Sequence, residues 1–263
     1  MHRFLIDAIF ACLGILICIS AFWAHQEGYL NDTISRIGFG IRYGELFPTI
    51  QGVSWVVFFI GLGELIQRSV AMKREQRALS SSLLPAGHGR VFRRGDLGQI
   101  YRSADRMSKD LIFPKTVKRI VSSFQISGSV VQSSSVLQSS MDSINNEVEL
   151  RYSFLKYLLW LLPSLGFIGT VWGIGRGLNV ISERPPTIEN ATSVMREVTG
   201  ELSVAFDTTL VALLLTSVLA YLIYLTMTDE EKLVNLASER CMDDLVNQLL
   251  EDNQTPRTDE AMR

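Results

Sequence analysis

Four long apolar segments dominate the pattern of hydrophobic and polar positions along the chain. They cover residues 4–23, 46–66, 153–175 and 202–227, and each contains a single charged residue. With a rise of about 1.5 Å per residue, each segment is long enough to cross about 30 Å of hydrocarbon as an α-helix. The pattern therefore predicts an all-α membrane protein with four transmembrane helices.

The positively charged residues lie mainly in one of the segments between these spans. Residues 67–152 hold 14 of the 25 lysines and arginines, whereas residues 24–45 and 179–201 hold two each. Lysine and arginine are enriched on the cytoplasmic side of membrane proteins. We therefore expect a multi-pass protein whose middle segment and both termini are cytoplasmic.

Apolar periodicity predicts long helices that extend into the cytoplasm. The second span is expected to continue as a basic helix to Leu79, and a short helix is expected over residues 97–111, ended by Phe113-Pro114. From Lys115 the pattern predicts a helix that runs without a break into the third span. Nine of the nineteen residues 122–140 are serine, so low complexity is the alternative for that stretch.

The remaining polar parts contain one further helix and two irregular stretches. Residues 80–89 have the composition of a loop. An apolar stripe predicts a last helix over residues 229–250, and the chain from Asn253 is expected to be disordered.

Composition and charge exclude several classes of function. The chain has a net charge of −2, whereas a nucleic-acid binder needs a concentrated basic face. The three histidines, His2, His25 and His88, fall on different sides of the membrane in the predicted topology, which argues against a histidine-based metal site or catalytic triad. We therefore expect a protein that is not an enzyme and that holds no metal or cofactor.

The third span carries a stripe of small residues. Gly166, Gly169, Gly173 and Gly177 lie three or four residues apart, which gives a flat helix face that another helix can approach closely. Thr170 lies beside this face. On spacing alone, tight helix packing is the favoured interpretation, with the Thr170 hydroxyl bonded to a carbonyl one turn back.

The fourth span carries a weakly polar stripe. Thr209 and Thr216 share a helix face with Ala212 or Leu213 in an otherwise apolar sequence. Hydroxyl groups on two adjacent helices suit a narrow water path for a small cation, because they replace part of its hydration shell. The two spans together are therefore a candidate ion pathway.

These two spans carry a resemblance to a known family. Residues 162–173, Leu-Pro-Ser-Leu-Gly-Phe-Ile-Gly-Thr-Val-Trp-Gly, resemble the signature helix of the MotA/TolQ/ExbB proton-channel family. Residues 205–213 resemble the family's next helix, with Ala212 in place of a glycine. The resemblance covers residues 146–227. The layout of the first two spans is similar to the flagellar-stator branch, and Gly-Thr-Val-Trp-Gly is more similar to the ExbB/TolQ branch.

The resemblance implies the channel subunit of a stator-like motor complex in the bacterial inner membrane, which converts proton-motive force into rotation or mechanical work. Family members form a homo-oligomeric ring, usually a pentamer, around the single transmembrane helices of two ExbD/TolR/MotB-like partner subunits. The ion-binding aspartate belongs to the partner, and Thr170 and Thr209 match the family's pore threonines that face it. Thr208 beside Thr209 is similar to sodium-driven stators, so Na⁺ is the alternative to H⁺ as the translocated ion.

Asp207 departs from the family pattern. It lies five residues into the fourth span, and at 100° per residue it points about 160° away from Thr209. One interpretation is an acid at the membrane interface near the start of its helix, where the helix dipole favours a negative charge. The other is an ion collector at the outer mouth of the pathway, or a salt bridge with a neighbouring subunit.

These features divide the chain into four parts: an N-terminal transmembrane hairpin (1–66), a cytoplasmic segment (67–145), a channel domain of two transmembrane helices (146–227) and a cytoplasmic C-terminal helix and tail (228–263). The expected partners are further copies of this chain, the single-span subunit and membrane lipid, with no nucleic acid. The alternative function is a non-conducting membrane scaffold, in which the glycine face only packs helices.

Overall fold

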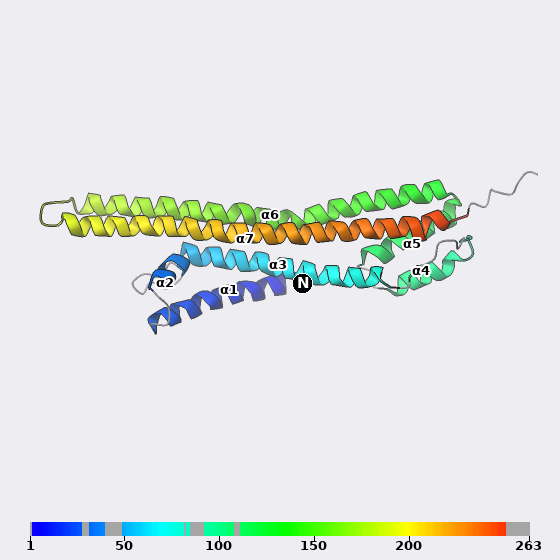
Figure 1. Cartoon of the computed structure of the whole chain (residues 1–263), viewed down its shortest axis with the longest axis horizontal. Coiled ribbons are helices and arrows are strands. Elements are labelled where there is room, and N and C mark those ends of the chain that lie inside the picture. Colours follow the sequence, from blue (N-terminus) through cyan, green and yellow to red (C-terminus); the bar gives the residue numbers. More distant parts are fainter. Residues whose placement is uncertain are drawn as a thin grey trace, which may run out of the picture. The chain divides into compact units, whose positions relative to one another are not determined.

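The computed structural model describes residues 2–27, 32–39, 49–81, 83–84, 92–107 and 111–250, without the side chains of residues 2–7, 26, 32–34 and 36. Its regular elements are helices, apart from a single parallel β-bridge between Phe92 and Leu249 (Figure 1). In chain order they are α1 (His2–Gln26), α2 (Asp32–Phe39), α3 (Ile50–Leu79), α4 (Leu97–Arg106), α5 (Ile112–Ser127), α6 (Val130–Glu183), α7 (Ala191–Asp244) and the 3₁₀ helix η1 (Val246–Gln248).

Four of these helices, α1, α3, α6 and α7, are long and apolar enough to cross a membrane. The predicted all-helical fold with four candidate spans is therefore confirmed. The second span was expected from residue 46, and residues 46–48 lie outside the described part of the chain. Thr49 caps α3, because its side-chain oxygen accepts a hydrogen bond from the Gly52 N–H at 3.1 Å. The helix then continues to Leu79, as predicted.

The chain divides into two compact units. The first consists of residues 1–67 and 153–225, and the second of residues 68–152 and 226–263. The long helices α3, α6 and α7 each contribute residues to both units.

In the first unit, glycines allow close contact between the apolar helices. A Cβ atom added at Gly63 of α3 would lie 2.7 Å from the ring of Phe10, so α1 packs directly on the α3 backbone there. Gly61 of the same helix faces Leu158 of α6 and Leu219 of α7. Such contacts are available to helices in lipid because glycine adds no side-chain volume at the interface.

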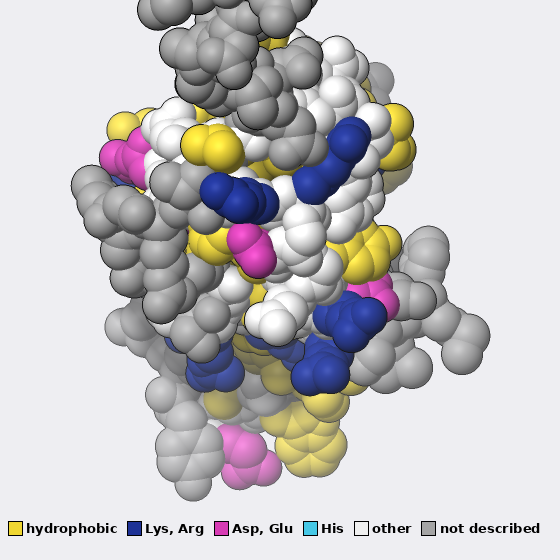
Figure 2. Space-filling view, turned by 90° about the vertical axis from the view of Figure 1, so that its right-hand side faces the viewer, with side chains coloured by type: hydrophobic (Ala, Val, Ile, Leu, Met, Phe, Trp, Pro, Cys, Tyr) yellow, Lys and Arg dark blue, Asp and Glu magenta, His cyan; other side chains and the backbone are white. Residues whose placement is uncertain are grey.

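In the second unit, α4 and α5 pack against each other. The apolar stripes predicted before the third span and after the fourth span are largely buried, at Leu137, Met141, Ile144 and Val148 of α6 and at Ala237, Cys241, Leu245 and Leu249 near the C-terminus. Val130 and Leu233, the first residue of each stripe, are half-buried. Helical periodicity therefore identified the core side of both segments correctly. On the face that Figure 2 shows, Lys and Arg side chains are scattered among acidic and hydrophobic ones.

The unbroken helix predicted from Lys115 into the third span is wrong, because α5 and α6 are separated at Gly128 and Ser129. Gly128 has a φ of 67°, in the left-handed region that favours glycine, and its N–H donates to the Phe124 carbonyl at 2.8 Å. This geometry ends α5 with a C-cap. The serine-rich residues on either side of the break are helical, as predicted.

Two other predicted boundaries are also wrong. The short helix α4 ends at Arg106 rather than at residue 111. Pro114 does not end a helix but lies in the first turn of α5, where a proline needs no N–H partner. The predicted last helix does not begin at residue 229 but is the end of α7, which runs from Ala191 to Asp244 and stops before the predicted residue 250. Most of the expected loop 80–89 and the tail from Asn253 lie outside the described residues.

Candidate functional site

The glycine stripe of α6 lies against α7 in the first unit. A Cβ atom added at Gly166 would lie 2.7 Å from the Ala212 Cβ, and one added at Gly173 would lie 2.7 Å from the Ala205 Cβ. Real Cβ atoms do not approach so closely, so an added methyl group at either position would force the helices apart. Gly169 faces the Thr208 side chain and Gly177 faces Leu202 in the same way.

This close approach brings two threonines of the sequence-predicted pathway together. The Thr170 and Thr209 hydroxyls are in direct hydrogen-bond contact, one from each helix. Thr170 Oγ1 also lies 3.2 Å from the carbonyl oxygens of Gly166 and Ala205. Thr209 Oγ1 lies 3.1 and 3.3 Å from the same two oxygens. Two hydroxyls and two carbonyls therefore form a cluster of four oxygens between α6 and α7.

The cluster offers more acceptors than it has protons. Each hydroxyl carries one proton, and a carbonyl oxygen has two lone pairs. The Ala205 carbonyl also accepts a hydrogen bond from the Thr208 hydroxyl, at 2.8 Å, and lies within reach of the Thr170 and Thr209 hydroxyls. An oxygen-rich group of this kind can replace part of the hydration shell of a small cation. Both Thr170 and Thr209 are partly exposed in the single chain.

Of the other two predicted pathway threonines, Thr208 shares only the Ala205 carbonyl with this cluster, and Thr216 bonds elsewhere. Thr208 is buried against Gly169. The Thr216 hydroxyl donates to the Ala212 carbonyl one turn back, at 2.7 Å. Backbone acceptors within α7 therefore satisfy the Thr208 and Thr216 hydroxyls.

Asp207 is almost completely buried in the single chain, with 9% of its surface exposed. The Ser203 hydroxyl lies 3.5 Å from its Oδ2 atom, one turn back along α7. The helix begins at Ala191, so Asp207 is far from the first turn and the helix dipole cannot explain its position. The interpretation of Asp207 as an acid near the start of its helix is therefore wrong.

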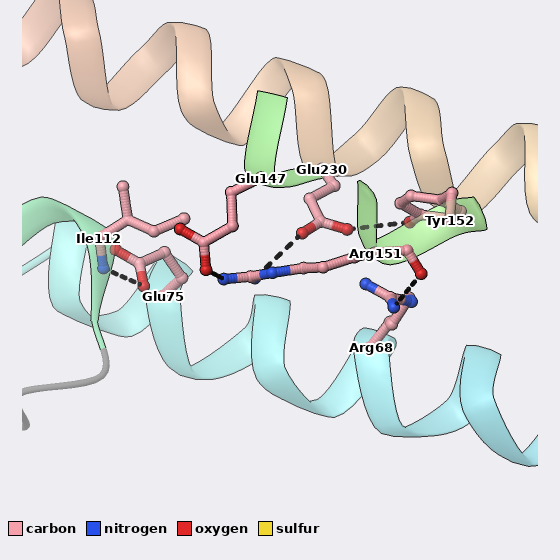
Figure 3. A network of polar contacts seen from close by, with 7 residues as sticks. All are labelled: Arg68, Glu75, Ile112, Glu147, Arg151, Tyr152 and Glu230. Atoms are coloured by element: carbon pink, nitrogen blue, oxygen red, sulfur yellow. Dashed lines mark hydrogen bonds and ion pairs between the residues drawn. The ribbon is translucent and has the colours of Figure 1, made fainter. Parts of the chain in front are cut away.

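A second polar cluster, in the second unit, was not identified from the sequence (Figure 3). We call it the Tyr152 cluster, and its members are Arg68 of α3, Glu147, Arg151 and Tyr152 of α6, and Glu230 of α7. Glu147 lies just before the predicted third span. Hydrogen bonding to Arg151 holds the pKa of its carboxyl below the usual range. The sequence did not predict this cluster, because its members come from three helices and are up to 162 positions apart.

No group of three or more metal-ligating side chains is found among the described residues. The sequence profile of the family described as the MotA/TolQ/ExbB proton channel family matches residues 108–237. The matched stretch contains both Thr170 and Thr209. No curated protein matches the chain.

Proposed function

Residues 108–237 form a domain of the MotA/TolQ/ExbB proton channel family, and from this premise we propose that the chain is the channel subunit of a proton-driven, stator-like motor complex. This family is not enzymatic. Membership implies a channel subunit of an ion-driven motor-like complex that associates with ExbD/TolR/MotB-type partners. The observation that carries the proposal is the contact between the Thr170 and Thr209 hydroxyls inside the matched domain.

In the proposed mechanism, the oxygen cluster faces the ion-binding aspartate of the partner. A proton that enters from outside neutralises this aspartate, which can then pass the apolar wall formed by α6 and α7. Loss of the proton on the cytoplasmic side restores the negative charge of the aspartate. The charged aspartate then favours contact with the oxygen cluster of the next subunit in the ring. Each proton that crosses about 100 mV releases roughly 2.3 kcal/mol, which is available for rotation or other work.

The proposed assembly is a homopentameric ring around the single helices of two partner subunits. Exposed apolar side chains support it, because α6 and α7 still expose Phe167, Val171, Trp172, Leu210 and Leu214 in the single chain. Lipid, neighbouring copies and the partner are the surroundings that such side chains require. We propose the bacterial inner membrane as the location, with both termini in the cytoplasm.

The proposed ion is H⁺, with Na⁺ as the alternative. Thr170 and Thr209 are the proposed pathway residues, and Thr216 extends the same side of α7 toward the cytoplasm. A site for Na⁺ needs several oxygens free to point at the ion. The Thr208 hydroxyl is buried and bonded to Ala205, which supports H⁺.

Ion flux into liposomes that hold this chain with its single-span partner tests the proposal. We expect proton uptake that disappears when the partner's aspartate is replaced by asparagine and falls at least several-fold in Thr170→Val and Thr209→Val. Valine keeps the shape of threonine but lacks the oxygen. Thr199→Val is the matched control, because its hydroxyl is exposed and bonded to Met195 of its own helix.

The non-conducting scaffold is the second candidate. The tight Gly166 and Gly173 contacts fit it, since they would pack α6 on α7 even if no ion passes. An intact complex that passes neither H⁺ nor Na⁺ would favour the scaffold or a plugged resting state of the channel. If the liposomes take up Na⁺ instead of H⁺, the motor proposal stands and the translocated ion is Na⁺.

A further inference from the structure

Two charged side chains of α3 are buried in the second unit. Arg68 is 5% exposed and Glu75 is 6% exposed. They are seven residues apart, so they lie two turns from each other on the same side of the helix. A buried charge is costly unless it is paired and hydrogen-bonded. The partners of these two side chains therefore indicate what α3 holds together.

Arg68 connects α3 to α6, and α6 connects to α7 (Figure 3). The Arg68 guanidinium donates to the Arg151 carbonyl at 2.6 Å and lies 4.7 Å from the centre of the Tyr152 ring. The Tyr152 hydroxyl donates to Glu230 Oε2 at 2.9 Å. Arg151 pairs with Glu230 at 3.7 Å and with Glu147 at 2.5 Å. One connected cluster therefore reaches from α3 through α6 to α7.

Glu75 connects α3 to the start of α5. Its two carboxylate oxygens accept hydrogen bonds from the N–H groups of Ile112 and Phe113, at 2.9 and 2.7 Å. The N-cap residue of α5 is Leu111, which has no side-chain oxygen, and Pro114 has no N–H. The free N–H groups at a helix N-terminus need an acceptor. Glu75 therefore caps α5 from a different helix.

We infer that α3 couples the start of α5 to the α6–α7 pair through Glu75 and the Tyr152 cluster. A shift between α6 and α7 at Glu230 displaces Arg68, and two turns of rigid helix pass the displacement to the Glu75 carboxylate. The α5 N-terminus has no cap of its own, so its first amides respond to that displacement. Every group involved lies in the second unit, so the inference does not depend on ion conduction.

Hydrogen–deuterium exchange on the full chain in lipid nanodiscs tests the coupling. The readout is the exchange rate of the Ile112 and Phe113 amides divided by that of the Gly128 amide, which is bonded to Phe124 and reports general loosening of α5. We expect Glu75→Gln to raise this ratio roughly tenfold, because a neutral acceptor binds the amides more weakly. The remote variant Glu230→Gln should raise it roughly threefold. The exposed neighbour Glu231→Gln should leave it unchanged.

The path through Arg68 is tested in the same way. In an Arg68→Met background, Glu230→Gln should no longer change the ratio, because the two variants act on one connected path. Arg68→Lys, which keeps the charge, replaces Arg68→Met if the methionine variant does not fold. If Glu230→Gln leaves the exchange ratio unchanged, the proposed coupling is overturned, even if Glu75→Gln changes the ratio. An effect of Glu230→Gln that persists without the arginine overturns the role of Arg68.

Discussion

At the scale of single residues, the proposed pathway depends on which threonine hydroxyls donate only to the backbone of their own helix. Threonines in membrane helices commonly donate to a carbonyl one turn back, and Thr216 does so. Thr170 and Thr209 have the same option, but each also contacts the other. A proton of this pair can therefore change acceptor at little cost, since alternative acceptors are already in place. Thr216 lacks this choice, although sequence spacing put it on the same helix face.

Asp207 gives the first residue-scale prediction. We propose that its carboxylate attracts cations to the outer end of the pathway, and we expect Asp207→Asn to lower proton flux severalfold at low ionic strength. The reduction should shrink as salt is added, because screening removes long-range attraction. Flux measured in liposomes at two salt concentrations checks this. Unchanged flux at low salt would exclude the collector, and loss of the ring in the same variant would favour a salt bridge between subunits.

Cys241 gives the second prediction at the scale of single residues. The thiol is completely buried on α7, well beyond the predicted fourth span, and burial raises its pKa to about 12. At pH 8 only about one thiol in ten thousand is then ionised, so alkylation by maleimide should be negligible. Raising the pH to 9 should not restore reactivity, because 9 is still far below the raised pKa. Mass spectrometry should detect labelling of Cys241 only after denaturation. Rapid labelling of the folded chain would contradict the burial.

At the scale of helices, the sequence predicted what depends on local periodicity and missed what depends on distant partners. The stripe from Leu137 to Val148 is buried because helical spacing alone determines which side of a helix is apolar. The break at Gly128 carried a local signal, glycine between two serines, but periodicity on either side concealed it. The capping of α5 by Glu75 carried no local sequence signal, because the carboxylate and the two N–H groups that it accepts from are 37 and 38 positions apart.

The contact between α6 and α7 gives the prediction at this scale. Gly173→Ala should separate the two helices, since its methyl group would lie 2.7 Å from that of Ala205. Overpacking of this kind costs about 1–3 kcal/mol, and we expect a lower thermal unfolding temperature and a reduced proton flux. Gly175→Ala is the matched control, because an added Cβ there has no atom within 4 Å. Equal effects of the two variants would show that helix propensity, and not the interhelical contact, decides the outcome.

At the scale of the whole molecule, the two long helices constrain how the chain meets the membrane. α6 and α7 have 54 residues each, or about 81 Å at 1.5 Å per residue. This length is more than twice the hydrocarbon thickness of about 30 Å. Both helices must therefore extend well outside the bilayer. We propose that most of that length lies on the cytoplasmic side, since 14 of the 25 lysines and arginines precede the third span in residues 67–152.

This topology is open to direct labelling in whole cells. In a chain whose three cysteines are replaced by serine, we expect a membrane-impermeant maleimide to label Thr192→Cys in intact cells. This exposed residue lies in the first turn of α7, at the end of the helix that we propose to be outside. Gln125→Cys, exposed on α5, should be labelled only after the cells are permeabilised. Labelling from outside at residue 125 would invert the orientation and place the basic segment outside. In that case the ion would enter the pathway from the end of α6 and α7 that we assign to the cytoplasm, and the direction of the proposed motor would be reversed.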